Sequence, residues 1–220
     1  MKLKKYKKMG FNKYQLLEIA VGLEKGLDVS IYAKPEFNKF QMAAIRFGLE
    51  QGLDPSFFAT PMFNNYQMLE IIDGLRLGLG ALVSIYAKPE FNDDQMFQIK
   101  HGLLEDLSVA VYVNPEFDAD QMQQIRYGLK EGLDVLEYAN PGFSTDQMTQ
   151  IRYGLKRGLD VSEYSKTKFD AHQMAEIAYG LFRELDVSEY NDPELTSDEM
   201  AEIVETQIKK KVKNAIKKWR

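Results

Sequence analysis

A 26-residue period runs through almost all of this 220-residue chain and constrains its fold more than any other feature. Phenylalanine, glutamine and isoleucine recur in one register, and the glutamines are spaced by 26, 26, 28, 26, 26 and 26 residues. These glutamines are Gln15, Gln41, Gln67, Gln95, Gln121, Gln147 and Gln173, with Glu199 in the eighth place. Periods of about 20–50 residues are typical of arrays in which each unit buries its apolar face against its neighbours. The chain is therefore predicted to form a repeat array.

Each unit carries the start and stop signals of one helix. In the fifth copy, Asp118 is placed to act as the N-cap and Gln121, three residues later, completes a capping box. Met122, Ile125 and Leu129 follow at the spacing of an apolar helical stripe. Gly132 then occupies the place of a left-handed residue in a Schellman stop. We expect a helix of about 13 residues in each unit.

A second, shorter helix is expected after the glycine. Asp134 and Glu137 have the spacing of a D-x-x-E capping box, and Pro55 directly follows Asp54 at a place that suits the first helical residue. Pro141 ends this segment in the fifth copy, so the second helix is predicted to have about two turns. Glycines inside the first helix, such as Gly128, are predicted to admit another helix at close range, because each costs about 1 kcal/mol relative to alanine.

These signals predict an all-α fold, an α-solenoid of about eight 26-residue helix–turn–short-helix repeats with terminal caps, as a single domain over residues 1–220. Residues 1–10 form a degenerate half-repeat, 11–76 hold repeats 1–3, 84–194 hold repeats 4–7 and 195–220 form a capping helix. Two extra residues fall within 77–83, where we predict a kink or a change of superhelical phase.

The capping helix combines an apolar stripe with seven basic residues. Its stripe is predicted to consist of Ile208, Val212, Ala215 and Trp219. Such a helix suits a membrane surface or nucleic acid as well as the end of an array. The capping role is favoured, because the last repeat of an array needs an apolar face towards its neighbour and a polar face outside.

The charge is unevenly distributed along the sequence. Residues 9–208 hold sixteen basic and thirty-three acidic side chains, a net charge of −17, whereas both ends are basic. An acidic body disfavours nucleic acid over most of its surface and attracts cationic partners.

The sequence offers little for catalysis. It has no cysteine, and its two histidines, His101 and His172, lie in different repeats at different positions of the unit. It shows no phosphate-binding loop, nucleophile elbow or zinc-ligand spacing, and helix capping already explains the periodic aspartates. We predict a protein without catalytic residues, cofactor or metal. No apolar run is long enough to span a membrane and no signal-peptide core follows the basic start, so we expect a cytoplasmic protein without a membrane partner.

Two sets of helix residues vary between the repeats and are candidate binding surfaces. The first is a basic and aromatic stripe, consisting of Arg46, Phe47, Lys100, Arg126, Tyr127, Arg152, Tyr153 and Tyr179. Arginine and tyrosine are enriched at protein interfaces. The alternative is that the arginines pair with acids of the next repeat and the tyrosines fill grooves between repeats. The second is an aromatic ladder of Tyr14, Phe40 and Tyr66, which is either covered by an adjacent element or forms a contact surface.

The string from Gln121-Met122 through Ile125-Arg126 and Gly128-Leu129 to Gly132-Leu133-Asp134-Val135 resembles a repeat of uncharacterised Firmicutes proteins from phages and mobile elements. The resemblance implies a helical array and a role in host–element conflict, and it carries over no functional residue. We expect a non-enzymatic scaffold for protein–protein interaction. The alternatives are an acidic nucleic-acid mimic, direct nucleic-acid binding through the basic ends and the basic and aromatic stripe, and a small ligand held between repeats.

Overall fold

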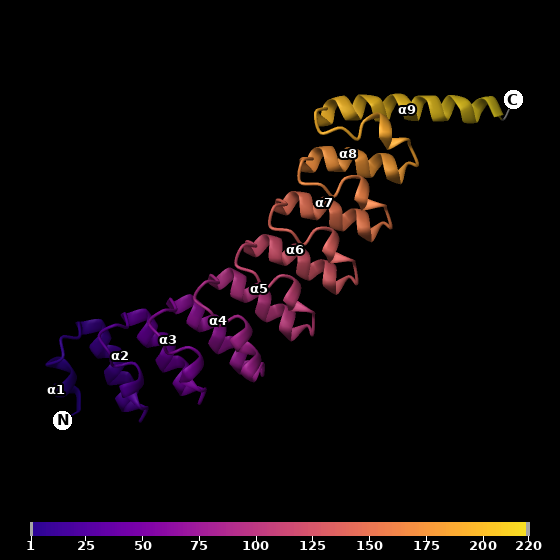
Figure 1. Ribbon diagram of the computed structural model, residues 1–220. Helices are drawn as coiled ribbons and strands as arrows, with labels where there is room; N and C mark the ends of the chain where they lie inside the picture. The colour runs from indigo at the N-terminus through magenta and orange to yellow at the C-terminus, as the bar shows by residue number, and fades with distance from the viewer. Residues whose placement is uncertain (1, 219–220) are drawn as a thin grey trace. The chain divides into compact units, whose positions relative to one another are not determined.

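The computed structural model describes residues 2–218, apart from the side chains of Lys2 and Lys218 (Figure 1). Throughout this range the chain forms α-helices and short 3₁₀ helices and contains no strand. The α-helices are α1 (Lys2–Lys7), α2 (Lys13–Glu24), α3 (Lys39–Glu50), α4 (Asn65–Arg76), α5 (Asp93–Leu104), α6 (Ala119–Lys130), α7 (Thr145–Lys156), α8 (Ala171–Phe182) and α9 (Ser197–Lys218). The predicted all-α solenoid is confirmed.

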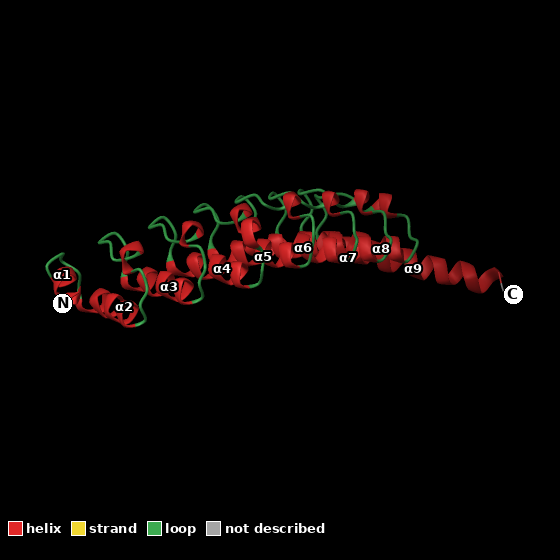
Figure 2. Ribbon diagram, turned by 90° about the horizontal axis from the view of Figure 1, so that it is seen from below, coloured by secondary structure: helices red, strands yellow, loops and turns green. Residues whose placement is uncertain are grey.

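The chain divides into two compact units, unit 1 (Met1–Val109) and unit 2 (Ala110–Arg220). Helices α1 to α5 pack in chain order in unit 1, and α6 to α9 do so in unit 2. In each unit the long helices lie side by side in one layer, and the 3₁₀ turns and loops lie along the other side of that layer (Figure 2). The 3₁₀ helices are η1 (Val29–Ile31), η2 (Pro55–Phe57), η3 (Gly80–Ile85), η4 (Val109–Val111), η5 (Val135–Glu137), η6 (Val161–Glu163) and η7 (Val187–Glu189).

The predicted helix starts are confirmed in α2 to α8. The side chain of Asn12, for example, accepts a hydrogen bond from the backbone nitrogen of Gln15 at 3.0 Å, and the Gln15 side chain accepts one from the backbone nitrogen of Asn12 at 3.0 Å. The N-cap residues of these seven helices are Asn12, Asn38, Asn64, Asn92, Asp118, Ser144 and Asp170. Each long helix therefore begins with two backbone donors satisfied by local side chains.

The helix ends also follow the predicted stop. Gly132 has a φ of 71°, and the nitrogen of Leu133 donates to the carbonyl oxygen of Gly128 at 2.9 Å. In two repeats another residue occupies this left-handed place: Asp106 has a φ of 55° and Glu184 one of 54°. A side chain makes this conformation less favourable than it is for glycine.

The second segment is shorter than predicted in every repeat except the one that contains η3. It forms a single 3₁₀ turn of three residues, as in Val135–Glu137, and for these repeats the expectation of a two-turn helix with a D-x-x-E capping box is wrong. Asp134 does cap this turn, because its carboxylate accepts from the nitrogen of Leu136 at 3.1 Å. The acidic residue at the end of the turn has another partner: in the next repeat, Glu163 accepts from Nδ2 of Asn191 at 2.9 Å.

The glycine inside each long helix makes room for an aromatic ring, not for the backbone of another helix as predicted. Tyr138, which directly follows the 3₁₀ turn, is fully buried and its hydroxyl donates to the carbonyl oxygen of Gln124 at 3.1 Å. A Cβ atom on Gly128 would overlap this hydroxyl and would also press on Val135. The packing of this ring and its hydrogen bond thus hold the 3₁₀ turn against the helix of its own repeat. Burial raises the pKa of Tyr32, Tyr164 and Tyr190, which occupy the same place in other repeats, to about 12.

The repeating glutamine joins consecutive repeats in addition to capping its own helix. Nε2 of Gln41 donates to the carbonyl oxygen of Phe63 at 2.7 Å and to that of Pro61 at 3.2 Å. In unit 2, Nε2 of Gln121 donates in the same way to the carbonyl oxygen of Phe143 at 2.6 Å. Buried amide donors of this kind need a partner, so the glutamine fixes the register between neighbouring repeats.

The two extra residues near position 80 are absorbed in a longer 3₁₀ helix, η3. Across this insertion, Nε2 of Gln67 still donates to the carbonyl oxygen of Phe91, at 2.6 Å. The hydroxyl of Tyr86 also keeps its hydrogen bond to the carbonyl oxygen of Glu70, at 3.2 Å. The insertion therefore preserves the local contacts of the repeat, and the change of superhelical phase stays a prediction.

Candidate binding surface

Three basic residues of the predicted stripe, Arg46, Lys100 and Arg152, are held in ion pairs between repeats. Lys100 in α5 is only 3% exposed, and its Nζ lies 2.8 Å from a carboxylate oxygen of Glu70 and 2.6 Å from one of Asp73, both in α4. Burial opposes the charged form of Lys100, but the hydrogen bonds from these two carboxylates prevail and raise its pKa. The ammonium group is therefore part of the α4–α5 contact and is not presented to solvent.

The arginines of the stripe are placed similarly. Nε of Arg46 lies 2.8 Å from a carboxylate oxygen of Glu18 in the preceding repeat, and its guanidinium also pairs with Glu50. Nη1 of Arg152 lies 2.9 Å from Glu131. Hydrogen bonding to Lys156, and then to Arg152, holds the pKa of Glu131 below its usual value.

Arg126 is buried as well. For Arg46, Lys100 and Arg152 the acids come chiefly from the preceding repeat, and not from the next one as the alternative interpretation expected. The basic side chains of the stripe thus contribute to the packing of the array.

The aromatic members of the same stripe lie at the surface. Tyr127, Tyr153 and Tyr179 are 37%, 46% and 44% exposed, and Phe47 is 36% exposed. The guanidinium of Arg152 lies 5.7 Å from the ring centre of Tyr127 and 4.8 Å from that of Tyr153, within the range of cation–π attraction. These rings partly cover the buried cations and expose one edge.

The aromatic ladder is the most exposed of the predicted sites. Tyr14, Phe40 and Tyr66 are 50%, 58% and 62% exposed at the first turns of α2, α3 and α4. Nζ of Lys39 lies 4.5 Å from the ring centres of both Tyr14 and Phe40 and so connects two successive rungs. The ladder was expected either to be covered by an adjacent element or to form a contact surface, and in unit 1 its side chains are exposed.

The ladder continues onto further residues that the sequence analysis did not single out. Counting the first phenylalanine of each unit as position 1, the ladder occupies position 4, and positions 7 and 11 lie on the same side of the helix. In unit 1 these three positions hold seven exposed apolar side chains, although position 4 of α5 is already acidic, with Asp94. The seven are here called the unit 1 apolar face: Tyr14, Leu17, Phe40, Phe47, Tyr66, Leu69 and Phe97. The sequence contained a signal for this face, because position 7 holds leucine or phenylalanine in three repeats of unit 1 and a polar residue in α6 and α7.

Unit 2 presents a different surface at the same three positions. Position 4 holds Asp120 and Asp146 in α6 and α7, and position 7 holds Gln123 and Thr149. Only position 11 remains aromatic, with the tyrosines already described. The repeats of unit 2, residues 110–208, hold 20 acidic and 8 basic side chains, a net charge of −12.

The described residues hold neither a metal-ligand cluster nor a membrane-spanning helix. Residues 2–218 contain no cluster of three or more acidic or histidine side chains arranged to hold a metal ion. Within the same range no helix combines the length and apolar character needed to cross a bilayer.

Comparisons with known proteins gave no relative. No protein-family model matches the chain, and no curated protein or solved structure matches it.

Proposed function

We propose that this protein is a non-enzymatic helical-repeat scaffold that binds a protein partner through the unit 1 apolar face. The exposure of seven large apolar side chains on one side of α2 to α5 carries this proposal. Soluble proteins seldom gather exposed apolar side chains in one place unless that place makes an interaction.

The choice of this face over the basic and aromatic stripe rests on what each set of side chains already does. Lys100 and Arg152 are engaged within the array, so a partner would have to break ion pairs to reach them. Tyr14, Phe40 and Tyr66 are at least half exposed. A partner that covers them removes apolar surface from water without disturbing the fold.

The size of the face decides how much of it a partner must cover. Full burial of one large apolar side chain contributes about 1.5–3 kcal/mol, so a half-exposed ring contributes about half of that. Association costs at least about 4 kcal/mol in lost freedom of motion. Three rings alone would therefore give weak binding, and we expect the partner to span α2 to α5.

Two lysines define the chemistry at the edge of the face. Lys39 lies over two rungs of the ladder, and Nζ of Lys13 lies 4.8 Å from the ring centre of Tyr14. A partner surface with apolar side chains at its centre and carboxylates at its edge fits this arrangement. The resemblance of the repeat to proteins of phages and mobile elements suggests a host or element protein as the partner.

The test is an affinity comparison with matched variants. The partner is isolated by affinity capture on the full chain and identified, and its affinity is then measured for Tyr14→Ser/Phe40→Ser/Tyr66→Ser. The control is Tyr127→Ser/Tyr153→Ser/Tyr179→Ser, which removes three exposed rings from unit 2. We expect at least about a hundredfold loss in the first variant, since three rings contribute about 3 kcal/mol. Equal losses in both variants would disprove the assignment to unit 1.

The charge of unit 2 supports a second candidate function, an acidic mimic of nucleic acid. Its repeats carry a net charge of −12, and Asp120 and Asp146 lie exposed in register on successive helices. Such a surface would occupy the basic groove of a nucleic-acid-processing protein. Charge-led binding weakens steeply with salt, whereas binding through the unit 1 apolar face changes little. Comparing the partner's affinity for Asp120→Asn/Asp146→Asn at low and high salt separates the two functions.

A further inference from the structure

The last helix extends well beyond the helix on which it packs. α9 has 22 residues, whereas α8 has 12 and ends at Phe182 (Figure 1). Gln207 and Lys211 hold the middle of α9: Nε2 of Gln207 donates to the carbonyl oxygen of Asp186 at 2.8 Å, and Nζ of Lys211 donates to that of Arg183 at 2.8 Å. Among the described residues, Lys211 is the last one in α9 whose side chain bonds to another element of the chain. The capping role predicted for this helix thus accounts only for its first half.

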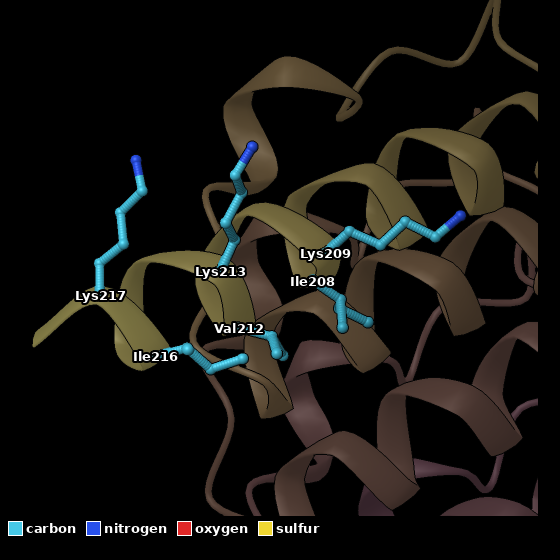
Figure 3. Close-up of a pocket in the computed structure, with 6 residues that line it drawn as sticks. All are labelled: Ile208, Lys209, Val212, Lys213, Ile216 and Lys217. Atoms are coloured by element: carbon cyan, nitrogen blue, oxygen red, sulfur yellow. The ribbon is translucent and has the colours of Figure 1, made fainter. Parts of the chain in front are cut away.

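The extended part of α9 carries an exposed apolar stripe. Ile208, Val212 and Ile216 follow one another at intervals of four residues and lie along one side of the helix, where they line a shallow groove (Figure 3). Val212 is 51% exposed and Ile216 is 54% exposed. Ala215, which the sequence analysis placed in the stripe, is also exposed, and Trp219 lies outside the described residues. A stripe meant only for capping would be covered by the array.

Lysines follow one flank of this stripe. Lys209, Lys213 and Lys217 each come one position after a stripe residue and line the groove together with the stripe (Figure 3). Lys211, on the opposite flank, is held by the carbonyl oxygens of Arg183 and Glu184. Residues 206–220 include seven basic residues and no acidic one. This segment is therefore a basic amphipathic helix, and Lys211 joins it to the acidic loop that follows α8.

We propose that residues 208–217 bind in the plane of an anionic lipid surface. The apolar stripe would enter the boundary between headgroups and acyl chains, while Lys209, Lys213 and Lys217 beside it reach the lipid phosphates. Double-stranded nucleic acid would match the lysines but leave the stripe in water. A second copy of α9 would bring like charges together. A flat anionic surface satisfies both the stripe and the lysines beside it.

The position of the helix supports this orientation. The repeats of unit 2 carry a net charge of −12 and would be repelled by anionic lipid. Because the stripe lies past the end of α8, the lysines can approach the surface before the acidic repeats do. This departs from the sequence-based expectation of no membrane partner, which treated the stripe as part of the cap. Since only one short helix is involved, binding is expected to be weak, reversible and sensitive to salt.

Co-sedimentation of the full chain with vesicles tests the proposal. Vesicles of phosphatidylcholine alone are compared with vesicles in which about a third of the lipid is phosphatidylserine. Because each lysine near an anionic surface adds attraction, we expect binding to anionic vesicles to be stronger by about tenfold or more. It should fall again when the salt concentration is raised.

A matched pair of variants separates insertion of the stripe from general charge effects. Val212→Asp/Ile216→Asp should abolish binding to anionic vesicles. The control Leu82→Asp/Leu136→Asp makes the same change of charge at two apolar residues that are 49% and 76% exposed elsewhere, and it should retain most of the binding. Val212→Ser/Ile216→Ser repeats the test without added charge, and circular dichroism confirms that the variants keep their helices.

Three results would overturn the proposal. The first is equal binding to neutral and anionic vesicles. The second is unchanged vesicle binding after both stripe substitutions. The third is an absence of vesicle binding together with a gel shift of DNA that is the same for the native chain and for Val212→Asp/Ile216→Asp, which would assign the lysines to nucleic acid.

Discussion

Unit 1 and unit 2 share one framework and present different surfaces. In both, a glutamine joins successive repeats, a tyrosine lies against a helix glycine, and a side chain caps each long helix. The same helix positions that hold Tyr14 and Phe40 in unit 1 hold Asp120 and Asp146 in unit 2. Positions 4 and 7 take no part in these shared contacts. We infer that their residue types differ between the units because the two surfaces bind different partners or none.

The two units differ in how many buried tyrosines pack against the helix glycines, and this difference affects stability at high pH. Burial raises the pKa of Tyr164 and Tyr190 in unit 2 and of Tyr32 in unit 1 to about 12, whereas Phe58 takes this place in one repeat of unit 1. The folded pKa lies above the unfolded value of about 10, so the contribution to stability is complete below pH 10 and is lost as pH rises to about 12.

The largest expected effect is therefore cooperative loss of helix between pH 10 and pH 12. Circular dichroism and tyrosinate absorbance should change together over this range. Tyr164→Phe/Tyr190→Phe should move the midpoint to higher pH by more than Tyr32→Phe does, because it removes two ionising groups. Titration of these tyrosines near pH 10 while the helices persist would show that they are not locked in the framework.

Substitution of a helix glycine tests whether the stability of both units depends equally on the packing of the buried tyrosine against that glycine. Gly74→Ala in unit 1 and Gly154→Ala in unit 2 each place a methyl group where a tyrosine hydroxyl lies. We expect each to lower the free energy of unfolding by about 3 kcal/mol, as overpacking does, measured by urea denaturation. Gly158→Ala is the control, because it meets no atom and introduces only a strained φ. A loss of stability in only one of these two variants would contradict a common framework.

The ion pairs between repeats are expected to have a smaller effect. Lys100→Met leaves Glu70 and Asp73 without their cation, and we expect it to destabilise the fold by about 2 kcal/mol because the carboxylates remain partly hydrated. Arg152→Met in unit 2 should cost a similar amount. Thermal unfolding of both variants measures this. If Lys100→Met left stability unchanged and weakened partner binding, Lys100 would belong to the binding surface.

The smallest effect is expected at the two left-handed residues, one in each unit. Asp106→Gly and Glu184→Gly should each stabilise the fold by about 0.5–1 kcal/mol, because glycine adopts this φ without steric cost. Asp106→Ala is the comparison that keeps the strain. A gain for Asp106→Gly without one for Glu184→Gly would mean that the exposed Glu184 helps to hold α9 through Lys211.

Local signals in the sequence were enough to predict the long helices. Asp118, Gln121 and Gly132 act within a few residues of one another, so their roles follow from the order of residues alone. The single 3₁₀ turn was missed because Asp134 and Glu137 fit an α-helical capping box equally well. The fit of Tyr138 against Gly128, which fixes the turn, depends on contacts that no local pattern contains.

The candidate surfaces were harder to predict for the same reason. Position 10 of the unit is basic in some repeats and apolar in others, and only the packing shows that Lys100 and Arg152 point at acids of the preceding repeat. Exposure of the ladder depends on the absence of a covering element over Tyr14, Phe40 and Tyr66 in unit 1. The overhang of α9 could not be predicted because its apolar stripe resembles that of a helix packed along its whole length.

Site-specific photo-crosslinking tests the central claim, that the common framework presents its protein-binding face in unit 1. A photoreactive phenylalanine analogue is placed at Phe40 of unit 1 or at Tyr153 of unit 2, two exposed aromatic positions, and the full chain is irradiated with its captured partner. We expect a crosslinked partner from Phe40 and none from Tyr153. A crosslink from Tyr153 alone would contradict this claim and assign binding to unit 2.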